Sequence, residues 1–171
     1  MMKDEKTGAD SKAMNVPYTL YSEEDLPAEI SRLFASAREA TAQSYVPYSS
    51  FRVGSAIAME DGQVVTGSNQ ENASFPAGIC SERVGLVKAS TLHPGVKMMR
   101  IAIVAIPDSG NIPVPVTPCG ICRQSLLEYE VRQDSPLEVW FYTSENKYAC
   151  IPSSSFLLPF SFTKNDLKSI G

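Results

Sequence analysis

The pattern of apolar positions changes its period repeatedly along this chain, and each change predicts a new element. Apolar residues three and four positions apart predict an amphipathic helix over 27–44. These residues are Ile30, Leu33, Phe34, Ala37 and Ala40. Two apolar runs on either side of Asp61-Gly62, a strong hairpin signal, predict strands over 53–59 and 64–67.

The second half of the chain continues this alternation. A loop containing Asn, Ser, Pro and Gly over 69–79 leads into a predicted helix over 80–91, and the β-branched run over 100–106 predicts a strand buried on both faces. The remaining elements are a helix over 120–131 and strands over 137–143 and 148–151. This order predicts an α/β fold in which helices cover both faces of one sheet.

Length and charge limit the possible functions. The chain has 171 residues and a net charge of −4, which suits one globular domain and, without a run of Lys and Arg, argues against a polynucleotide partner. The polar stretch 1–15 lacks the apolar region of a signal peptide, and no apolar run is long enough to span a bilayer. We therefore expect a flexible tail over 1–15, one domain over 16–171, no membrane association and a cytoplasmic location.

Two cysteine motifs carry the candidate chemistry. They are Cys80-Ser81-Glu82 and, downstream, Pro118-Cys119-Gly120-Ile121-Cys122. The thiolates of Cys80, Cys119 and Cys122 supply three soft ligands for one Zn²⁺ per chain and leave one position open, which distinguishes a catalytic zinc site from a closed structural one. Glu82 can then move protons beside a water held at that position. The pattern predicts a zinc-dependent hydrolytic enzyme.

Both motifs lie where a loop becomes a predicted helix. Three thiolates on Zn²⁺ give a cluster of net charge −1, which is a poor Lewis acid, and two helix N-termini would withdraw part of that charge. Arg83, next to Glu82, can add charged hydrogen bonds to thiolate sulfur from outside the ligand set. With this compensation, a bound water can ionise near neutral pH.

Each motif also has a simpler interpretation. A lone C-x-x-C occurs in redox motifs and structural zinc sites alike, and an acidic residue such as Glu82 is common in the first turn of a helix. A zinc-stabilised binding module without chemistry would need a fourth ligand, for which Cys150 is the only spare thiolate. His93, the only histidine, precedes Pro94-Gly95 in a loop and is expected to face solvent rather than act in catalysis.

With their flanking residues, the motifs resemble those of cytidine deaminase, and more narrowly the small homotetrameric type with an all-cysteine zinc site. The likeness extends over about 27–167 and rests on four segments in the family's order. The segments are Phe51-Arg52-Val53-Gly54, 66–74, Cys80-Ser81-Glu82-Arg83 and 118–124. The resemblance implies a three-layer α-β-α sandwich with a mixed five-stranded sheet.

The resemblance implies a reaction as well. Cys80, Cys119 and Cys122 match the family's zinc ligands, and Glu82 matches its proton shuttle. The implied activity is hydrolytic deamination of cytidine and deoxycytidine to uridine and deoxyuridine with release of ammonia, a step of pyrimidine salvage. Zinc-bound hydroxide would attack C4 of the base while Glu82 carries protons to ring N3 and to the leaving amino group.

Substrate contacts follow from the same resemblance. Asn69 and Glu71 would hold ribose hydroxyls, and Phe51 would lie against the pyrimidine ring. Main-chain groups around Ser81 and Pro118 would hold the amide edge of the base. Because Asn69 and Glu71 are two residues apart, an extended backbone would direct both side chains to the same side.

The C-terminal stretch is expected to act on a second subunit. Phe162, with Phe160 as a second candidate, matches an aromatic residue that reaches a neighbouring subunit's site in the homotetramer. Three features depart from the family's pattern: Ser81 stands where alanine is usual, Phe75 where tyrosine is common, and the loop 108–117 is long. Two further alternatives are a deaminase of a modified or antibiotic nucleoside of the blasticidin S type and a deaminase of RNA or DNA; the acidic composition disfavours the latter.

Overall fold

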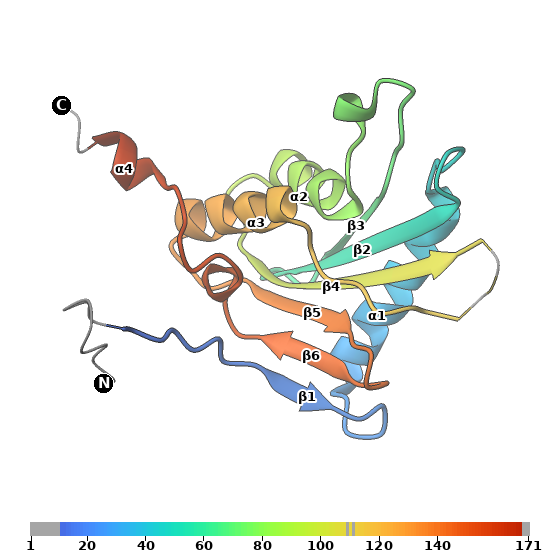
Figure 1. Ribbon diagram of the computed structural model, residues 1–171, viewed down its shortest axis with the longest axis horizontal. Coiled ribbons are helices and arrows are strands. Elements are labelled where there is room, and N and C mark those ends of the chain that lie inside the picture. Colours follow the sequence, from blue (N-terminus) through green and yellow to red (C-terminus); the bar gives the residue numbers. More distant parts are fainter. Residues whose placement is uncertain (1–10, 109, 111, 169–171) are drawn as a thin grey trace.

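A six-stranded mixed sheet forms the middle layer of the molecule, with strand order β1-β6-β5-β4-β2-β3 (Figure 1). The computed structural model describes residues 11–108, 110 and 112–168. The strands are β1 (Thr19–Tyr21), β2 (Phe51–Met59), β3 (Val64–Ser68), β4 (Met98–Pro107), β5 (Glu138–Tyr142) and β6 (Tyr148–Ile151). β4 pairs in parallel with β5, and the other neighbours pair antiparallel.

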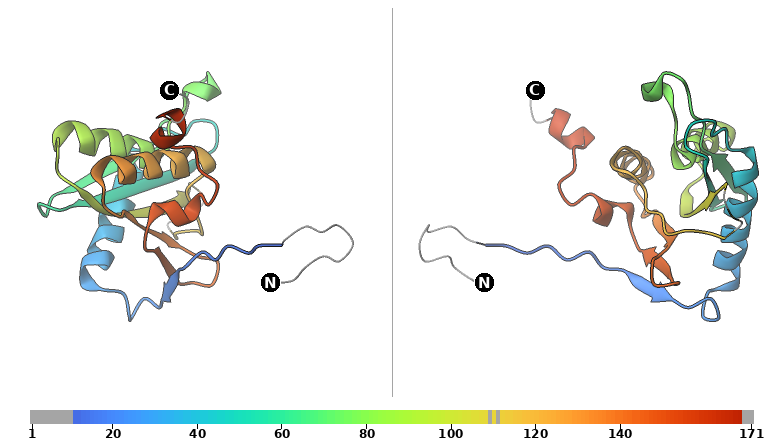
Figure 2. Two further views of the ribbon diagram at one scale, coloured as in Figure 1. Left: turned by 90° about the vertical axis from the view of Figure 1, so that its left-hand side faces the viewer. Right: turned by 45° about the vertical axis from the view of Figure 1, so that its right-hand side comes forward.

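Helices cover both faces of this sheet, which confirms the predicted three-layer arrangement. On one face lies α1 (Ala28–Ala40), continued by a 3₁₀ turn over Thr41–Gln43; on the other lie α2 (Ser81–Leu92) and α3 (Gly120–Gln133), side by side (Figure 1). Short 3₁₀ turns occupy Phe75–Ala77 and Ser154–Leu157, and a short helix, α4 (Lys164–Lys168), projects from the body (Figure 2).

The sheet has six strands rather than the expected five because β1 adds to its edge. β1 has only three residues, paired antiparallel with β6 from Thr19 opposite Cys150 to Tyr21 opposite Tyr148. So short a segment shows no alternation of its own, and only its partner makes it a strand. Of the tail predicted over 1–15, residues 1–10 lie outside the described residues.

Each face of the sheet packs its own apolar cluster against its helices. The larger cluster lies under α2 and α3 and includes Leu86, Ala89 and Leu126; the smaller lies under α1 and includes Leu33, Phe34 and Trp140. As predicted, the middle of β4 is buried on both faces. None of the described helices is both long and apolar enough to cross a membrane.

The strand directions bring the starts of α2 and α3 to one edge of the sheet. β3 and β4 are both antiparallel to β2, so they run in the same direction and end at the same edge. α2 follows β3 and α3 follows β4 along the chain. The residues that begin these two helices can therefore meet, although 39 positions separate Cys80 from Cys119.

Candidate active site

Three cysteine sulfurs meet where α2 and α3 begin. Cys80 and Cys119 are the residues immediately before the two helices, and Cys122 lies in the first turn of α3. The Sγ atoms of Cys80 and Cys119 are 4.0 Å apart, those of Cys119 and Cys122 are 3.5 Å apart, and all three lie within 4.8 Å of one another. Tetrahedral Zn–S bonds of 2.3 Å would separate the sulfurs by about 3.8 Å. The spacing and the softness of the donors fit one zinc ion.

This set of thiols has no fourth protein ligand among residues 11–108, 110 and 112–168. Cys150, the one candidate from the sequence, lies on β6 and packs against the cluster under α1, on the opposite face of the sheet. The alternative of a closed structural site completed by Cys150 is therefore wrong. Three ligands with an open position match a catalytic zinc centre.

The surroundings of the cluster favour negative charge on the sulfur of Cys80. Cys80 and Cys119 are the N-cap residues of α2 and α3, so the partial positive charge of both helix N-termini lies next to the cluster. Hydrogen bonding from Cys122 lowers the pKa of Cys80 to about 7, with a further contribution from the charge of Arg83. The same bond, together with burial, raises the pKa of Cys122. Arg83 itself lines a hollow between α2 and α3 with Gln124.

Glu82 is held by contacts that the sequence did not reveal. Its side chain is only 4% exposed, and Ser81 Oγ donates a hydrogen bond of 3.0 Å to its Oε2. Ser55 on β2 in turn donates to the main-chain oxygen of Ser81 at 2.9 Å. Ser55, the one polar residue in the apolar run 53–59 of β2, was the available signal for this second contact.

A glycine lets α2 approach the sheet closely enough to make these contacts. A Cβ atom on Gly67 of β3 would lie 2.3 Å from the main-chain oxygen of Ser81 and 2.5 Å from the nitrogen of Gly85. Both neighbours are backbone atoms, so neither could give way without moving the helix. Gly67 therefore fixes the depth at which the first turn of α2, with Glu82, sits against the sheet.

A hollow of about 320 Å³ opens beside the thiols. Asn69, Glu71 and Cys80 line it together, with Tyr48 and Phe75 among its walls. The loop that forms it is anchored at its base, where Gln70 exchanges main-chain hydrogen bonds with Ile79. The structure thus brings two of the predicted substrate-binding residues to the same hollow as a predicted zinc ligand.

Asn69 extends the sheet as well as facing this hollow. Its Oδ1 accepts from the main-chain nitrogen of Val53 at 2.8 Å, and its Nδ2 donates to the main-chain oxygen of Phe51 at 3.0 Å. These bonds place Phe51, the first residue of β2, next to Asn69. An amide has two donor hydrogens and two acceptor lone pairs, so Asn69 retains capacity for a ligand.

Glu71 is fixed by the loop that precedes β2. Its Oε2 accepts from the main-chain nitrogens of Tyr48 and Ser49 at 3.0 and 3.3 Å. Hydrogen bonds from the Ser49 side chain and the Tyr48 main chain lower the pKa of this exposed carboxyl. Glu71 therefore presents a charged, preoriented acceptor at the hollow.

The C-terminal aromatic residues do not line this hollow within the one chain. Phe162 is 59% exposed and Phe160 is 88% exposed, and the main-chain oxygen of Phe162 accepts from Gln124 on α3. His93 lies just after the last residue of α2, at the end opposite Cys80, and its side chain is only partly exposed, beside Asp61, rather than facing solvent as expected.

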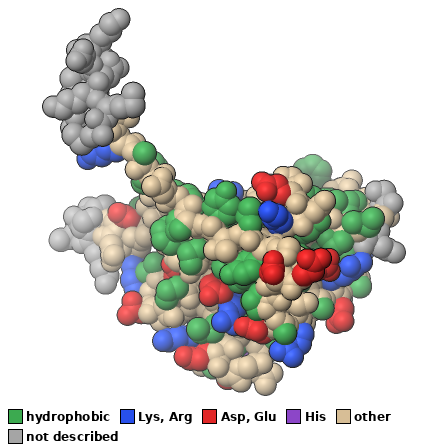
Figure 3. All heavy atoms as spheres, turned by 90° about the horizontal axis from the view of Figure 1, so that it is seen from below, with side chains coloured by type: hydrophobic (Ala, Val, Ile, Leu, Met, Phe, Trp, Pro, Cys, Tyr) green, Lys and Arg blue, Asp and Glu red, His purple; other side chains and the backbone are tan. Residues whose placement is uncertain are grey.

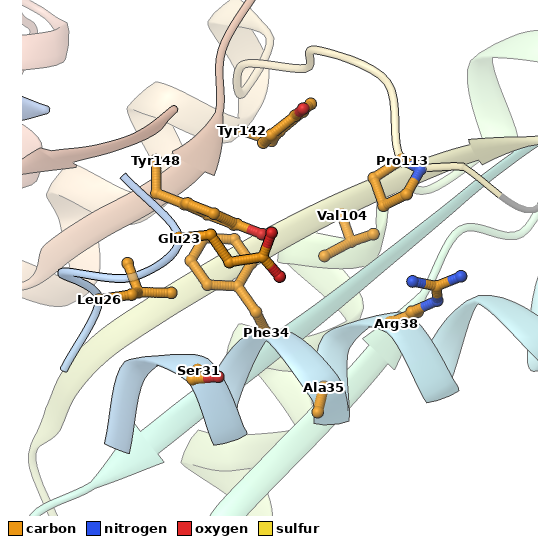
Figure 4. Close-up of a pocket in the computed structure, with 10 residues that line it drawn as sticks. All are labelled: Glu23, Leu26, Ser31, Phe34, Ala35, Arg38, Val104, Pro113, Tyr142 and Tyr148. Carbon is orange, nitrogen blue, oxygen red and sulfur yellow. The ribbon is translucent and has the colours of Figure 1, made fainter. Parts of the chain in front are cut away.

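A second hollow, of about 220 Å³, lies over α1 (Figure 4). Glu23, Arg38 and the ring of Tyr148 point into it, and it has none of the thiols or predicted substrate-binding residues in its lining. The three thiols and the buried carboxylate of Glu82 gather instead on the other face of the sheet.

Comparison with known proteins agrees with this geometry. A family model described as the cytidine and deoxycytidylate deaminase zinc-binding region matches residues 27–134. The cytidine deaminase of Sporosarcina psychrophila is 33% identical over 139 residues, which cover 81% of this chain and 95% of that protein. A probable cytidine deaminase of Dictyostelium discoideum is 32% identical over 142 residues, covering 81% of this chain and 87% of that protein.

Solved structures show the same relation. The crystal structure of cytidine deaminase from Burkholderia pseudomallei superposes with a TM-score of 0.65 at 34% identity, covering 77% of this chain and 98% of that chain. Cytidine deaminase from Mycobacterium tuberculosis gives 0.62 at 31%, covering 80% and 98%. With its three thiols at two helix N-termini and a buried glutamate beside them, the chain belongs to the cytidine deaminase family and is a zinc-dependent hydrolytic deaminase.

Proposed function

We propose that this protein deaminates cytidine and deoxycytidine to uridine and deoxyuridine, with release of ammonia. The observation that carries the proposal is the three-thiol cluster with an open position, next to the buried carboxylate of Glu82. The relatives named above support the substrate class, since each is a cytidine deaminase by name. They do not favour a modified or antibiotic nucleoside as the substrate.

Glu82 is the catalytic residue of this proposal. When bound, zinc supplies Lewis acidity and lowers the pKa of a water in its open position. Glu82 would take one proton from the attacking water, whose oxygen bonds to C4, and pass that proton to ring N3. It would then move the second proton from the new C4 hydroxyl to the amino group, so that the C4–N bond breaks, ammonia leaves and a carbonyl remains at C4. Ser81 Oγ holds Oε2 of the carboxylate at 3.0 Å, which limits its rotamers during these transfers.

The hollow beside Cys80 is the proposed nucleoside site. Glu71 and Asn69 would receive ribose hydroxyls, and Phe51 would lie against the base. Main-chain groups around Ser81 and Pro118 would hold the amide edge of the pyrimidine. Because the Asn69 and Glu71 side chains are already fixed by the backbone around β2, the site would bind ribose with little further ordering.

A homotetramer would complete this site. Four large apolar side chains are exposed on segments that adjoin the zinc ligands or bind α3: Phe75 in the wall of the hollow, Ile121 between two ligands, and Phe160 and Phe162 in the C-terminal segment. Exposed apolar groups gathered near one site mark a surface that another protein covers. We assign that surface to further copies of this chain, with Phe162, or Phe160 in its place, entering a neighbouring subunit's nucleoside site.

The proposed setting is nucleoside salvage in the cytoplasm, without nucleic acid or membrane as a partner. On the face seen in Figure 3, acidic and basic side chains are interspersed rather than gathered into a basic patch. Together with the net charge of −4, this distribution leaves that face without a basic surface that could bind a phosphate backbone.

The test is the ultraviolet absorbance of zinc-loaded protein mixed with cytidine. Loss of the cytidine band with stoichiometric ammonia would support the proposal, and Glu82→Gln with zinc bound should be nearly inactive. Glu39→Gln, the same substitution at an exposed position of α1, is the control. No change in absorbance with zinc present would refute cytidine as the substrate, and oligonucleotide binding at low salt would refute the choice of a free nucleoside.

A further inference from the structure

The carboxylate of Glu130 binds two other segments of the chain to the C-terminal half of α3. Its Oε2 accepts hydrogen bonds from the main-chain nitrogens of Leu137 and Ser154, at 2.9 and 2.8 Å, and from the Ser154 hydroxyl at 2.9 Å. Its Oε1 accepts from the hydroxyl of Ser153. Ser154 is fully buried, so its donors depend on this one carboxylate rather than on water.

These bonds fix the point at which the C-terminal segment leaves the sheet. β6 ends at Ile151, and Ser153 and Ser154 lead into the 3₁₀ turn over Ser154–Leu157. Leu137, just before β5, donates to the same oxygen of Glu130 as Ser154 does. Glu130 therefore sets the position of the departing segment relative to both α3 and the sheet.

From this point the segment follows α3 toward the zinc ligands. Arg123 donates from Nη1 to the main-chain oxygen of Leu157 at 3.4 Å, and Gln124 donates to that of Phe162 at 2.8 Å. Arg123 also donates from Nε to the main-chain oxygen of Pro118, beside Cys119. Helix α3 thus binds the start of the segment through Glu130 and its end through Gln124. Phe162 therefore lies near the N-terminal end of α3, where the zinc ligands are.

Glu130 is the contact on α3 that can be tested without disturbing the metal. Arg123 and Gln124 directly follow the ligand Cys122, and Arg123 also holds the loop of Cys119. Glu130 lies seven residues beyond Arg123 along α3, which is about 10 Å at the rise of an α-helix. A change there leaves the thiols and their helix N-termini in place.

We propose that Glu130 is a positioning residue that sets the register of segment 153–162 on α3 and thereby places Phe162 for catalysis. The proposal rests on the function given above, in which Phe162 enters a neighbouring subunit's site. An ionised carboxylate suits the task because it accepts every bond and donates none. Glutamine of the same shape could keep its oxygen toward the three donors at Oε2, but it would lose the negative charge that strengthens these bonds and would turn an NH₂ group toward Ser153 Oγ, which donates to Oε1.

The experiment compares Glu130→Gln with Glu39→Gln on α1, as zinc-loaded full chains. We expect Glu130→Gln to lower kcat/KM for cytidine about tenfold to a hundredfold, the range for losing charged hydrogen bonds, with one zinc retained per chain. Hydrogen exchange of residues 153–162 should become faster, while the first turns of α3 keep their protection. Ser154→Ala, which removes one donor and keeps the carboxylate, should show a smaller change in the same direction.

A double substitution separates positioning from general stability. If Glu130 acts through Phe162, then Phe162→Ala combined with Glu130→Gln should be no slower than Phe162→Ala alone. Full additivity, or a Glu130→Gln enzyme within about twofold of the wild type, would overturn the proposal. If the wild-type chain leaves cytidine unchanged, the proposed substrate is wrong. If hydrogen exchange of residues 153–162 is the same in Glu130→Gln as in the wild type, Glu130 does not set the register of the segment, whatever the substrate is.

Discussion

The two helical layers of this molecule pack on the same sheet but bury different kinds of side chain. α1 turns a regular apolar stripe to the sheet: Ile30, Leu33, Phe34, Ala37 and Ala40. α2 and α3 bury, among others, Ser81, Glu82, Gly85 and Cys122 at positions that face inward. The layer that carries the chemistry is the less amphipathic one, because polar and reactive groups occupy core positions.

Both layers need a glycine to approach the sheet, yet they use the approach differently. A Cβ on Gly54 would lie 2.0 Å from the main-chain oxygen of Ala37 in α1, and one on Gly67 would lie 2.3 Å from that of Ser81 in α2. Under α1 the close approach only packs helix against strand. Under α2 it also positions Glu82, so the same packing device serves stability on one face and catalysis on the other.

The largest expected effect comes from removing a thiol on the functional face. Cys122→Ala should lose zinc and all measurable deaminase activity, because two ligands and water bind Zn²⁺ far more weakly than three thiolates. Cys150→Ala, on the face of α1, should keep one zinc per chain and near wild-type turnover. Metal content by atomic absorption and the cytidine assay test both variants, and zinc loss in Cys150→Ala would contradict the assignment of the two faces.

Glu82→Gln should retain zinc and lose turnover. General acid–base catalysis contributes about 10²–10⁴-fold, and Glu82 is assigned several proton transfers, so we expect kcat to fall by at least the upper part of that range. Glu39→Gln on the exposed side of α1 should leave kcat unchanged. Single-turnover measurements on zinc-loaded protein separate the chemical step from binding, and a near-normal rate in Glu82→Gln would remove it from the mechanism.

The two glycines give a matched pair for separating stability from activity. Gly54→Ala and Gly67→Ala should each lower the free energy of unfolding by about 1–3 kcal/mol, since the added methyl group meets backbone atoms in both cases. At a temperature where both variants are folded, only Gly67→Ala should also lower kcat, because it displaces the turn that holds Glu82. Urea unfolding combined with kinetics distinguishes the two, and equal kcat values would show that the approach of α2 has no catalytic role.

The ability to foresee structure from this sequence differed between the two faces for a physical reason. Helix α1 follows from the helical spacing of its apolar residues. The hairpin between β2 and β3 follows from its turn residues, since Gly62 adopts a φ of 85°. The metal ligands could also be predicted, because three thiolates and a glutamate at this spacing have few other uses. By contrast, β1 depends entirely on pairing with β6, which no local pattern announces.

Contacts between distant segments were the main part that sequence reasoning missed. The bond from Ser55 to the Ser81 main chain and the four bonds to Glu130 join residues up to 26 positions apart. Ser81 was expected to contribute only main-chain groups, yet its hydroxyl reaches Glu82. Such contacts depend on how layers stack, and residue type alone does not specify them. The tail and domain limits, and the substrate contacts, stay predictions.

The smallest expected effect tests the Ser81 hydroxyl. Ser81→Ala keeps the main-chain groups assigned to the base but removes the hydrogen bond of 3.0 Å that Ser81 Oγ donates to Glu82 Oε2. A side-chain hydrogen bond to a charged group is worth about 1.5–3 kcal/mol when its loss is not compensated, and a water that reaches the carboxylate would recover part of it. We therefore expect kcat to fall about threefold to tenfold, with KM and zinc content unchanged.

Ser36→Ala on α1 is the control for this substitution, since it makes the same chemical change in a helix on the other face. If Ser81→Ala raised KM and left kcat unchanged, the hydroxyl would act in substrate binding rather than on Glu82. If neither constant changed, burial alone would hold the Glu82 side chain in place. A fall in kcat confined to Ser81→Ala would show that Ser81 fixes the carboxylate of Glu82 from within the same helical turn. Helix stability alone would not require serine at this position, because alanine has the highest helix propensity.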